Sequence, residues 1–352
     1  MREPAFWWQR QSVLATLLQP LAMIYGAVAA KRLRQAGRSA GVPVLCVGNL
    51  TVGGAGKTPT AIAIARLLLD CGQHPFFLTR GYGGRLAGPL RVDPKLHRAI
   101  DVGDESLLLA RVAPTIVARD RVAGAEMARV QGAGVLVLDD GLQNPSLAKD
   151  FALVVVDTRR AIGNGRLLPA GPLRVPVDAQ LDRADAVLAI GADPLPASLG
   201  EAAAARAMPI LRGTLVPDPG MAAGLTDQKY LAFAGIADPE KFFATLAGAG
   251  IDAPIRRGFA DHHRYSAADA AKLLETSKQH GLGLITTEKD LIRMSGDPQV
   301  VALAKHVRIL PVALQVEDKE TFRGLILNRL RRVGGLSTAG ARRDGAAGPL
   351  PA

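Results

Sequence analysis

The sequence predicts an α/β protein in which helices flank a mainly parallel sheet, with a second, smaller α/β domain after it. Short apolar runs of strand length alternate with helical segments, and a glycine-rich turn follows the first run. A stretch rich in proline, alanine and glycine at 192–224 weakens this pattern, which then resumes. At 352 residues, with 48% hydrophobic and 21% charged residues, the chain is globular and long enough for two domains.

The expected elements follow in chain order. Val42 to Val47 is the first strand, and the segment from Pro59 to Asp70 has the apolar spacing of a helix that ends at Gly72. Later strands of the large sheet are expected at Phe76 to Thr79, Thr115 to Ala118, Val135 to Leu138, Phe151 to Val156 and Ala186 to Ile190. Helices are expected between them at Glu105 to Val112 and Arg121 to Val130. The smaller unit is expected at Tyr230 to Ile236, Glu240 to Ala249, Leu284 to Thr286, Val307 to Ala313 and a basic helix at Lys319 to Arg332.

The charge of the chain narrows the class of partner. A net charge of +11 and a pI near 10 favour nucleic acid, anionic lipid or a phosphorylated substrate. Only 4% of residues are aromatic and no RNP, zinc-finger or helix-turn-helix signature is present, which argues against nucleic acid. Cys46 and Cys71 have no paired spacing, so a disulfide framework or zinc site is not expected and a reducing compartment fits.

The N-terminal region contains an uncharged apolar run from Ser12 to Ala30. It follows Phe6-Trp7-Trp8 and leads into basic residues at 31–38, as in a helix that lies in a membrane interface. Gln19-Pro20 interrupts the run, which has only the minimum length for a membrane span. The interfacial helix is the favoured interpretation, and a helix packed on the protein's own core and a true span remain alternatives.

The segment Gly48 to Pro59, GNLTVGGAGKTP, ends like a phosphate-binding loop. The standard pattern is G-x-x-x-x-G-K-[ST], and Thr51 stands here at its first glycine. The glycine-rich second half leaves backbone N–H groups free to surround a phosphate, and a lysine and a threonine open the following helix. We therefore expect a P-loop NTPase-type domain that binds ATP through Thr51, Val52, Gly53, Gly54, Ala55, Gly56, Lys57 and Thr58.

Two related loops do not fit. A dinucleotide fingerprint G-x-G-x-x-G that starts at Gly54 needs a glycine where the chain has Pro59. The ATPases of the partitioning type carry an additional lysine at the position that Val52 occupies here. A glycine turn that merely precedes a helix is the remaining alternative, and it leaves Lys57-Thr58 without a reason.

A carboxylate pair for the nucleotide's metal ion follows the strand Val135 to Leu138. Asp139 and Asp140 stand at the carboxyl end of this strand, as in a Walker B motif. A surface turn written Asp-Asp-Gly is the alternative. We expect Mg²⁺ at Thr58, Asp139 and Asp140, and the sequence does not distinguish which aspartate binds it directly.

A series of motifs resembles one family as a set. In order they are GNLTVGGAGKTP, Thr79-Arg80-Gly81-Tyr82-Gly83-Gly84, Val102-Gly103-Asp104-Glu105, Ala118-Arg119-Asp120-Arg121, Asp139-Asp140-Gly141-Leu142-Gln143, Gly171-Pro172-Leu173-Arg174, Phe233-Ala234-Gly235-Ile236, Asp261-His262-His263 and Thr287-Glu288-Lys289-Asp290. They occur in the order seen in tetraacyldisaccharide 4'-kinases, and the resemblance covers roughly residues 5 to 325.

The resemblance implies transfer of the γ-phosphate of ATP to the 4'-hydroxyl of a tetraacyldisaccharide 1-phosphate in lipid A biosynthesis. It also implies two α/β/α domains with an N-terminal membrane-associated helix, acting at the cytoplasmic face of the bacterial inner membrane. Such an acylated, anionic substrate suits a basic, membrane-seeking protein. No nucleic acid and no obligate protein partner is expected.

By the same resemblance, Asp104 accepts the proton of the attacking hydroxyl and His262 is its partner. A helix N-cap at Asp104 and a surface turn at Asp261-His262-His263 are the structural alternatives. Residues proposed to bind the acceptor or the transferring phosphate are Tyr82, Glu105, Arg119, Arg121, Gln143 and Arg174. The family commonly has glutamate after the arginine of Gly-Pro-Leu-Arg, but this chain has Val175, so that carboxylate's task is done otherwise or not at all.

Two other classes of function stay open from the residues alone. A P-loop GTPase or assembly ATPase is one, although Thr287-Glu288-Lys289-Asp290 lacks the spacer of the guanine-binding N/T-K-x-D pattern. A non-catalytic membrane protein with a vestigial nucleotide site is the other. The expected domain limits are 1–40 for the N-terminal helix and its basic flank, 41–224 for the P-loop domain, 225–332 for the smaller domain and 333–352 for a disordered tail.

Overall fold

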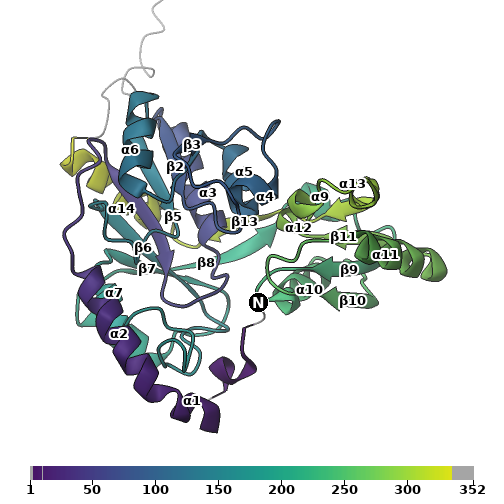
Figure 1. Ribbon diagram of the computed structural model, residues 1–352, viewed down its shortest axis with the longest axis horizontal. Coiled ribbons are helices and arrows are strands. Elements are labelled where there is room, and N and C mark those ends of the chain that lie inside the picture. Colours follow the sequence, from purple (N-terminus) through teal and green to yellow (C-terminus); the bar gives the residue numbers. More distant parts are fainter. Residues whose placement is uncertain (1–2, 10, 335–352) are drawn as a thin grey trace, which may run out of the picture.

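The fold is built on two sheets. The structure is a computed structural model that describes residues 3–9 and 11–334, so nearly all of the tail expected at 333–352 lies outside the described residues. Within the described ranges, nine strands form a larger sheet in the order β13-β8-β7-β6-β1-β5-β2-β4-β3, and four form a smaller sheet in the order β10-β9-β11-β12. Figure 1 shows the smaller sheet and its helices beside one end of the larger unit. The predicted α/β class is confirmed.

The larger sheet is parallel except at its two edges, where β3 and β13 run antiparallel to their neighbours. Its central strands are buried along their whole length because helices cover both faces, which explains their continuous apolar sequence. The strands of this sheet are β1 (Val44–Asn49), β2 (Pro75–Thr79), β3 (Leu90–Arg91), β4 (Thr115–Val117), β5 (Val135–Asp139), β6 (Phe151–Asp157), β7 (Ala186–Ile190), β8 (Ile210–Pro217) and β13 (Val312–Val316).

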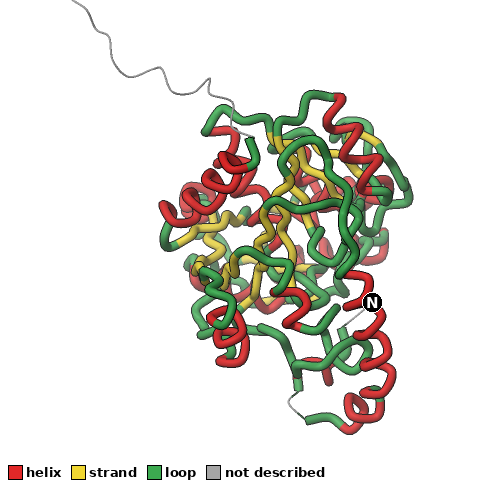
Figure 2. The backbone as a smooth tube through the Cα atoms, turned by 90° about the vertical axis from the view of Figure 1, so that its left-hand side faces the viewer, coloured by secondary structure: helices red, strands yellow, loops and turns green. Residues whose placement is uncertain are grey.

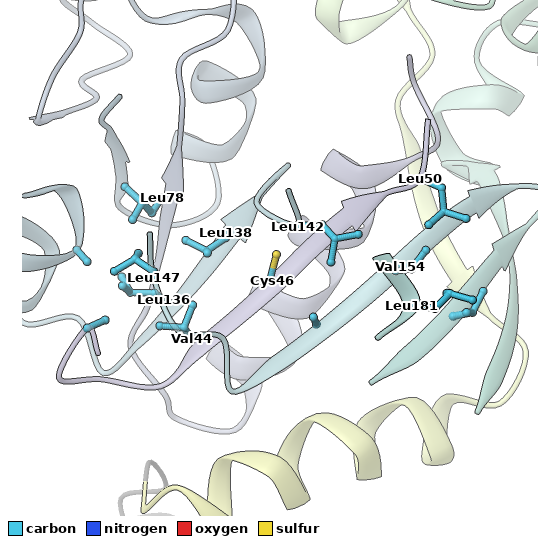
Figure 3. Close-up of a cluster of buried hydrophobic side chains, with 14 of the residues drawn as sticks. Val44, Cys46, Leu50, Leu78, Leu136, Leu138, Leu142, Leu147, Val154 and Leu181 are labelled. Atoms are coloured by element: carbon cyan, nitrogen blue, oxygen red, sulfur yellow. The ribbon is translucent and has the colours of Figure 1, made fainter. Parts of the chain in front are cut away.

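Helices pack on the two faces of this sheet in separate apolar clusters. One face is covered by α3 (Lys57–Asp70), α5 (Asp104–Ala110) and α14 (Lys319–Arg332). The other is covered by α6 (Arg121–Val130), α7 (Val177–Leu181) and α8 (Ala197–Ala204). Figure 2 shows strands between two groups of helices, and Figure 3 shows Val44, Cys46, Leu136 and Leu138 side by side on the second face.

The smaller sheet is fully parallel. Its strands are β9 (Tyr230–Ala234), β10 (Ile255–Gly258), β11 (Gly283–Thr286) and β12 (Val307–Ile309). The helices around it are α9 (Pro219–Ala223), α10 (Pro239–Gly248), α11 (Ala267–His280), α12 (Glu288–Arg293) and α13 (Pro298–Ala304). The short helix α4 (Ala99–Val102) belongs to the larger unit, directly before α5.

Two stretches differ from the sequence-based expectation. The stretch at 192–224 contains α8, β8 and α9. The sequence signal of β8 is weak because a glycine lies inside this strand and a proline ends it. The single strand expected at Val307 to Ala313 is two strands interrupted at Leu310-Pro311. The second of them, β13, pairs with β8, and α14 forms with its predicted bounds but packs on the larger sheet. The chain thus returns to the larger unit after the smaller sheet.

The N-terminal region forms a 3₁₀ turn, η1 (Ala5–Trp8), and two helices, α1 (Val13–Leu17) and α2 (Gln19–Leu33). Small residues of α2 face the protein, and a methyl group at Gly26 would collide with Leu167. Large apolar side chains of this region are exposed: Val13, Leu14, Leu17, Leu21, Met23, Ile24, Tyr25 and Val28. None of the described helices has the length and hydrophobicity needed to cross a membrane.

Candidate active site

The glycine loop leaves the larger sheet at its centre. β1 lies between β5 and β6, and Val47 of β1 pairs with Asp139 at the end of β5. The carboxyl ends of parallel strands meet at one edge, and in open α/β sheets ligands bind there. The loop and the aspartate pair are therefore brought to the same edge of the sheet.

The first half of the loop is held by backbone pairing with residues 172–174. Thr51 forms an antiparallel bridge with Leu173, and the Val52 N–H donates to the Pro172 carbonyl at 2.9 Å. The Arg174 N–H donates to the Leu50 carbonyl at 3.1 Å. The position that lacks the standard glycine is therefore extended chain, and its pairing brings Arg174 to the site.

The second half of the loop uses its glycines for backbone geometry. Gly53 and Gly56 have φ of 105° and 92°, a region that residues with a Cβ rarely adopt. The Lys57 ammonium donates to the Gly53 carbonyl at 3.1 Å and to Asn49 Oδ1 at 3.2 Å. Burial lowers the pKa of Lys57, which the nearby Asp140 carboxylate partly offsets. Lys57 thus lies folded against the loop at the start of α3.

Thr58 and Asp139 form an oxygen-rich pair beside the loop. The Thr58 hydroxyl donates to Asp139 Oδ2 at 3.0 Å, and Asp139 Oδ1 is buried with no hydrogen-bond partner among the described residues. Burial and the negative charge of Glu105 raise the pKa of Asp139 to about 7. An unpartnered carboxylate oxygen in this position fits a cation ligand.

Asp140 is oriented by a salt bridge with Arg174. The guanidinium contacts both carboxylate oxygens, at 2.8 and 3.1 Å, and also donates to Gln143 Oε1 at 3.2 Å. Burial alone would raise the pKa of Asp140, but the charges of Lys57 and Arg174 outweigh it and hold the pKa below its usual range. Asp140 and Gln143 thus orient Arg174 without a glutamate at position 175.

Val175 faces the N-terminal helix instead. It is buried in an apolar cluster with Ala30 and Leu33 of α2. In this chain the residue that follows Arg174 therefore packs against α2, where the family commonly has a carboxylate.

Asp104 and His262 meet across the two units. Asp104 opens α5 of the larger unit, and His262 follows β10 of the smaller one. His262 Nδ1 lies 3.2 Å from Asp104 Oδ1. The backbone of His262 is left-handed, with φ of 54°, and its N–H donates to the Gly235 carbonyl at 3.0 Å. Burial lowers the pKa of His262, but the hydrogen bond and charge of Asp104 outweigh it, so the pKa is raised above its ordinary 6.5.

Arg293, at the end of α12, holds the other oxygen of Asp104. Its Nε donates to Asp104 Oδ2 at 2.8 Å, and its Nη2 contacts the same oxygen. It also donates to the Gly235 carbonyl at 2.5 Å and to Asp290 at 3.1 Å. Burial opposes ionisation of Asp104, but the hydrogen bond from His262 and the charge of Arg293 hold its pKa well below the usual range. Asp104 is therefore a carboxylate engaged on both oxygens.

The motif Thr287-Glu288-Lys289-Asp290 has a structural task. Lys289 pairs with Glu105 at 2.6 Å, and Asp290 accepts from the Gly235 N–H at 2.9 Å. The first contact joins the smaller unit to the larger one and the second lies within the smaller unit, and neither leaves the motif free to read a guanine base.

His262, not His263, is the histidine that reaches Asp104. His263 Nε2 lies 3.1 Å from Asp269 Oδ2 at the start of α11, and its ring stacks on Phe259 at 4.6 Å between centroids. The structure therefore assigns His263 to the packing of the smaller unit.

One cavity of about 1510 Å³ joins these groups. Of the residues singled out from the sequence, the lining includes Val52, Gly53, Gly54, Gly56, Lys57, Thr58, Tyr82, Glu105, Arg119, Arg121, Asp139, Asp140, Gln143, Arg174 and His262. Asp104 is buried against His262 and does not line this cavity, and Thr51 and Ala55 line a second, very small cavity at the loop. Tyr25, Val28, Ala29 and Arg32 of α2 also line the large cavity, which therefore extends from the loop to the exposed apolar helix.

The residues expected to bind substrate differ in how exposed they are. Tyr82 and Arg119 are exposed at the cavity, and the Tyr82 ring lies 5.1 Å from that of His262. Arg121 is buried and contacts the Ala118 carbonyl, while its Nε has no hydrogen-bond partner among the described residues. Burial lowers the pKa of Arg121 to about 10.

Sequence reasoning missed Arg293, the role of Lys289 and that of Asn49. Lys289 and Arg293 contact residues about 185 positions away, so no local pattern could reveal their partners. The available signal was the polar Thr287-Glu288-Lys289-Asp290 run directly after a buried strand, where a helix N-terminus and a sheet edge coincide.

Comparison with known proteins decides the family. The family model described as tetraacyldisaccharide-1-P 4'-kinase matches residues 14–331. The chain belongs to this family. A tetraacyldisaccharide 4'-kinase of Rhodopseudomonas palustris strain BisB18 is 51% identical over 94% of this chain and 96% of its own length, and one of Nitrobacter winogradskyi is 47% identical over 95% and 99%.

Solved structures agree with this kinase family. LpxK of Aquifex aeolicus, crystallised in complex with ATP, superposes with a TM-score of 0.69 and 25% sequence identity, covering 90% of this chain and 99% of its own. The resemblance stated from the motifs is confirmed, and the chain is an ATP-dependent kinase of lipid A biosynthesis.

Proposed function

We propose that the chain transfers the γ-phosphate of ATP to the 4'-hydroxyl of a tetraacyldisaccharide 1-phosphate, giving the 4'-phosphorylated lipid. The observation that carries this proposal is the single cavity that extends from the glycine loop, past His262, to the apolar helix α2. A soluble small-molecule kinase has no need for that last wall, whereas an acylated sugar has both a polar head and chains to accommodate.

ATP is held by the loop in this proposal. The backbone N–H groups of residues 53–56 surround the phosphates, and Lys57 leaves the Gly53 carbonyl to neutralise the β- and γ-phosphates. Thr58, Asp139 and Asp140 would hold Mg²⁺, which would neutralise charge on the transferring group. Within the described ranges no three His, Cys, Asp or Glu side chains could bind a metal by themselves, so nucleotide phosphates would complete the coordination.

The proton of the attacking hydroxyl goes to the Asp104–His262 pair. The carboxylate can only accept a hydrogen bond, so it fixes the imidazole proton on Nδ1 and leaves the Nε2 lone pair available. Since His262 lines the cavity and Asp104 lies behind it, the geometry favours His262 as the group that meets the hydroxyl. Asp104 then orients the ring and stabilises its positive charge, a different division of roles from that implied by the resemblance.

Arginines that line the same cavity can bind the anionic groups of the acceptor and the transferring phosphate. Arg119 is exposed and available for the 1-phosphate, and Tyr82 and Gln143 line the same cavity. Arg174 and Arg121 lie closer to Asp140 and suit the transferring phosphate. Glu105, paired with Lys289, keeps the wall of this region in place.

The inner-membrane surface, at its cytoplasmic face, is the proposed place of action. The exposed apolar side chains of α1 and α2 are followed by Lys31, Arg32, Arg34 and Arg38, which suits a helix pair lying in an anionic interface. No obligate protein partner and no nucleic acid is proposed.

The direct test is transfer. Purified protein is incubated in detergent with γ-labelled ATP, Mg²⁺ and the disaccharide 1-phosphate lipid, and a labelled bisphosphorylated lipid is expected. Hydrolysis of ATP without label on the lipid, unaffected by adding lipid, would reject the kinase function in favour of an ATPase or switch.

A further inference from the structure

The N-terminal segment before α1 contacts the glycine loop from behind. Glu3 lies so close to Gly53 that a methyl group at Gly53 would collide with Glu3 Oε1. The space between loop and segment is a cavity of about 10 Å³ lined by Trp8, Arg160 and the loop backbone, which leaves room for one water at most. The segment therefore forms the rear wall of the loop.

Arg160, in the loop after β6, organises this wall. Its Nη1 donates to Glu3 Oε2 at 2.5 Å, and its guanidinium lies over the Trp8 ring at 4.6 Å from the centroid. It also donates to the Ala237 carbonyl at 3.2 Å, and its Nε lies 3.3 Å from Asp238. One guanidinium thus joins the N-terminal segment, the larger unit and the smaller unit.

The segment itself is fixed independently of α1 and α2. The Trp7 indole donates to the Pro169 carbonyl at 3.0 Å, and Asn164 binds the carbonyls of Phe6 and Trp7 through its side chain and its backbone N–H. Trp7 is buried. None of these contacts uses the exposed apolar residues of α1 and α2. The segment before α1 can therefore act on the loop independently of any binding of these helices to lipid.

We propose that Glu3, held by Arg160, is a positioning residue for the phosphate-binding loop. The inference rests on the proposed role of that loop in holding ATP. The Gly53 carbonyl is the group that Lys57 and Asn49 bind, and Gly53 has the left-handed backbone, so its position decides where the loop N–H groups point. A fixed rear wall lowers the entropic cost of ordering the loop around phosphate.

If Glu3 acted through its charge alone, its removal would make ATP binding stronger, which is the opposite of what a positioning role predicts. Glu3 and Asp238 are balanced by Arg160 and Arg159, so the cluster is neutral when both carboxylates are ionised. Burial raises the pKa of Glu3 even beside Arg160. Removing Glu3 leaves a net positive charge near the phosphates and would by Coulomb attraction strengthen ATP binding. The positioning role predicts that binding becomes weaker, and the sign of the change separates the two.

The experiment compares Glu3→Ala, Glu3→Gln and the matched control Gln9→Ala, an exposed residue of the same segment. Equilibrium binding of ATP, the KM for ATP and kcat are measured on the full chain in detergent, with vesicle sedimentation in parallel. Glu3→Ala is expected to raise Kd and KM for ATP about fivefold. The amide of Glu3→Gln can still accept from Arg160, so its loss is expected to be about twofold. Gln9→Ala is expected to leave the Kd and KM for ATP and kcat unchanged. Vesicle binding is expected to be the same in all these variants as in the wild type.

A double variant tests whether Glu3 acts through Arg160. Glu3→Ala in the Arg160→Ala background is expected to add no further loss of ATP affinity, because the pair acts as one unit. Unchanged or tighter ATP binding in Glu3→Ala and Glu3→Gln, or additive losses in the double variant, would overturn the proposal. Wild-type protein that neither binds ATP nor transfers phosphate would instead reject the proposed function itself, so the two failures are distinguishable.

Discussion

The two halves of the site are built in different ways. The nucleotide half consists of Lys57 and Thr58, which open α3 after the central strand β1, and of Asp139 and Asp140 at the end of the neighbouring strand β5. The proton-transfer half joins Asp104 of the larger unit to His262 and Arg293 of the smaller one. The first half is complete within one unit, whereas the second exists only while the two units stay together.

Because of this difference, substitutions can affect ATP binding and phosphate transfer separately. A site whose phosphate and metal ligands all belong to the larger unit is expected to keep its ATP affinity when Asp104, His262 or Arg293 is changed. A proton acceptor assembled between units is expected to depend on buried ion pairs, which are sensitive to the loss of either partner.

Lys57→Ala is expected to have the largest effect on turnover. It removes the charge that neutralises the β- and γ-phosphates, so we expect kcat to fall at least about 1000-fold in the lipid phosphorylation assay. Burial already disfavours the charged lysine, so the thermal midpoint should change little. A turnover near that of the wild type would remove Lys57 from the site.

Asp104→Ala is expected to combine a large loss of turnover with a loss of stability. Arg293 would remain buried without its main partner, which costs roughly 3–5 kcal/mol in comparable cases. Urea unfolding measures this, and the double variant Asp104→Ala, Arg293→Met is the control. We expect the second change to restore much of the stability but none of the activity. Equal stability of Asp104→Ala and wild type would contradict the buried pair.

The pH dependence tests which member of the pair receives the proton. His262 must be neutral to accept it, and its pKa is raised above 6.5, so kcat is expected to rise with pH through a midpoint above that value. In Asp104→Asn the charge that raises the pKa is lost, and the midpoint should move down. If Asp104 were the acceptor, its depressed pKa would give the rate no rise of its own across neutral pH.

Lys289→Met is expected to have a moderate effect. It breaks the 2.6 Å pair with Glu105 between the units but leaves both catalytic groups in place. We expect a loss of about tenfold in kcat with the Kd for ATP unchanged. Glu288→Gln, whose longer 3.7 Å pair with Arg111 is half-exposed, is the matched control and should stay near wild type.

Leu17→Ser with Ile24→Ser is expected to have the smallest effect on chemistry. Both side chains point away from the protein, at 71% and 66% exposure, so ATP binding and stability should not change. Sedimentation with anionic vesicles should fall several-fold, since less apolar surface enters the interface. Vesicle binding equal to that of the wild type would reject the interfacial role of α1 and α2.

The nucleotide half could be predicted from sequence because its parts are local. The loop follows one buried strand, and the aspartate pair follows another, so periodicity and short motifs locate both. The helices at Arg121–Val130 and Lys319–Arg332 were predicted with their observed bounds because each has a clear start signal or a sustained pattern. The division of the chain at 40, 224 and 332 stays a prediction.

The proton-transfer half and the N-terminal wall could not be predicted in the same way. Asp104 and His262 were named through family resemblance, while Arg293 and Glu3 have partners 189 and 157 positions away that only the fold brings near. The edge position of β13 was missed because a five-residue strand carries no information on which sheet it joins. Long-range pairing is thus the part that the sequence pattern does not contain.

One pair of measurements on His262→Ala tests the central contrast most directly: the Kd for ATP by equilibrium titration, and single-turnover transfer of labelled phosphate to the disaccharide lipid. The account predicts an unchanged Kd for ATP, because the nucleotide half lies on the larger sheet, and a transfer rate at least about 100-fold lower. A transfer rate equal to wild type, or an ATP affinity that falls in parallel with transfer, would contradict it.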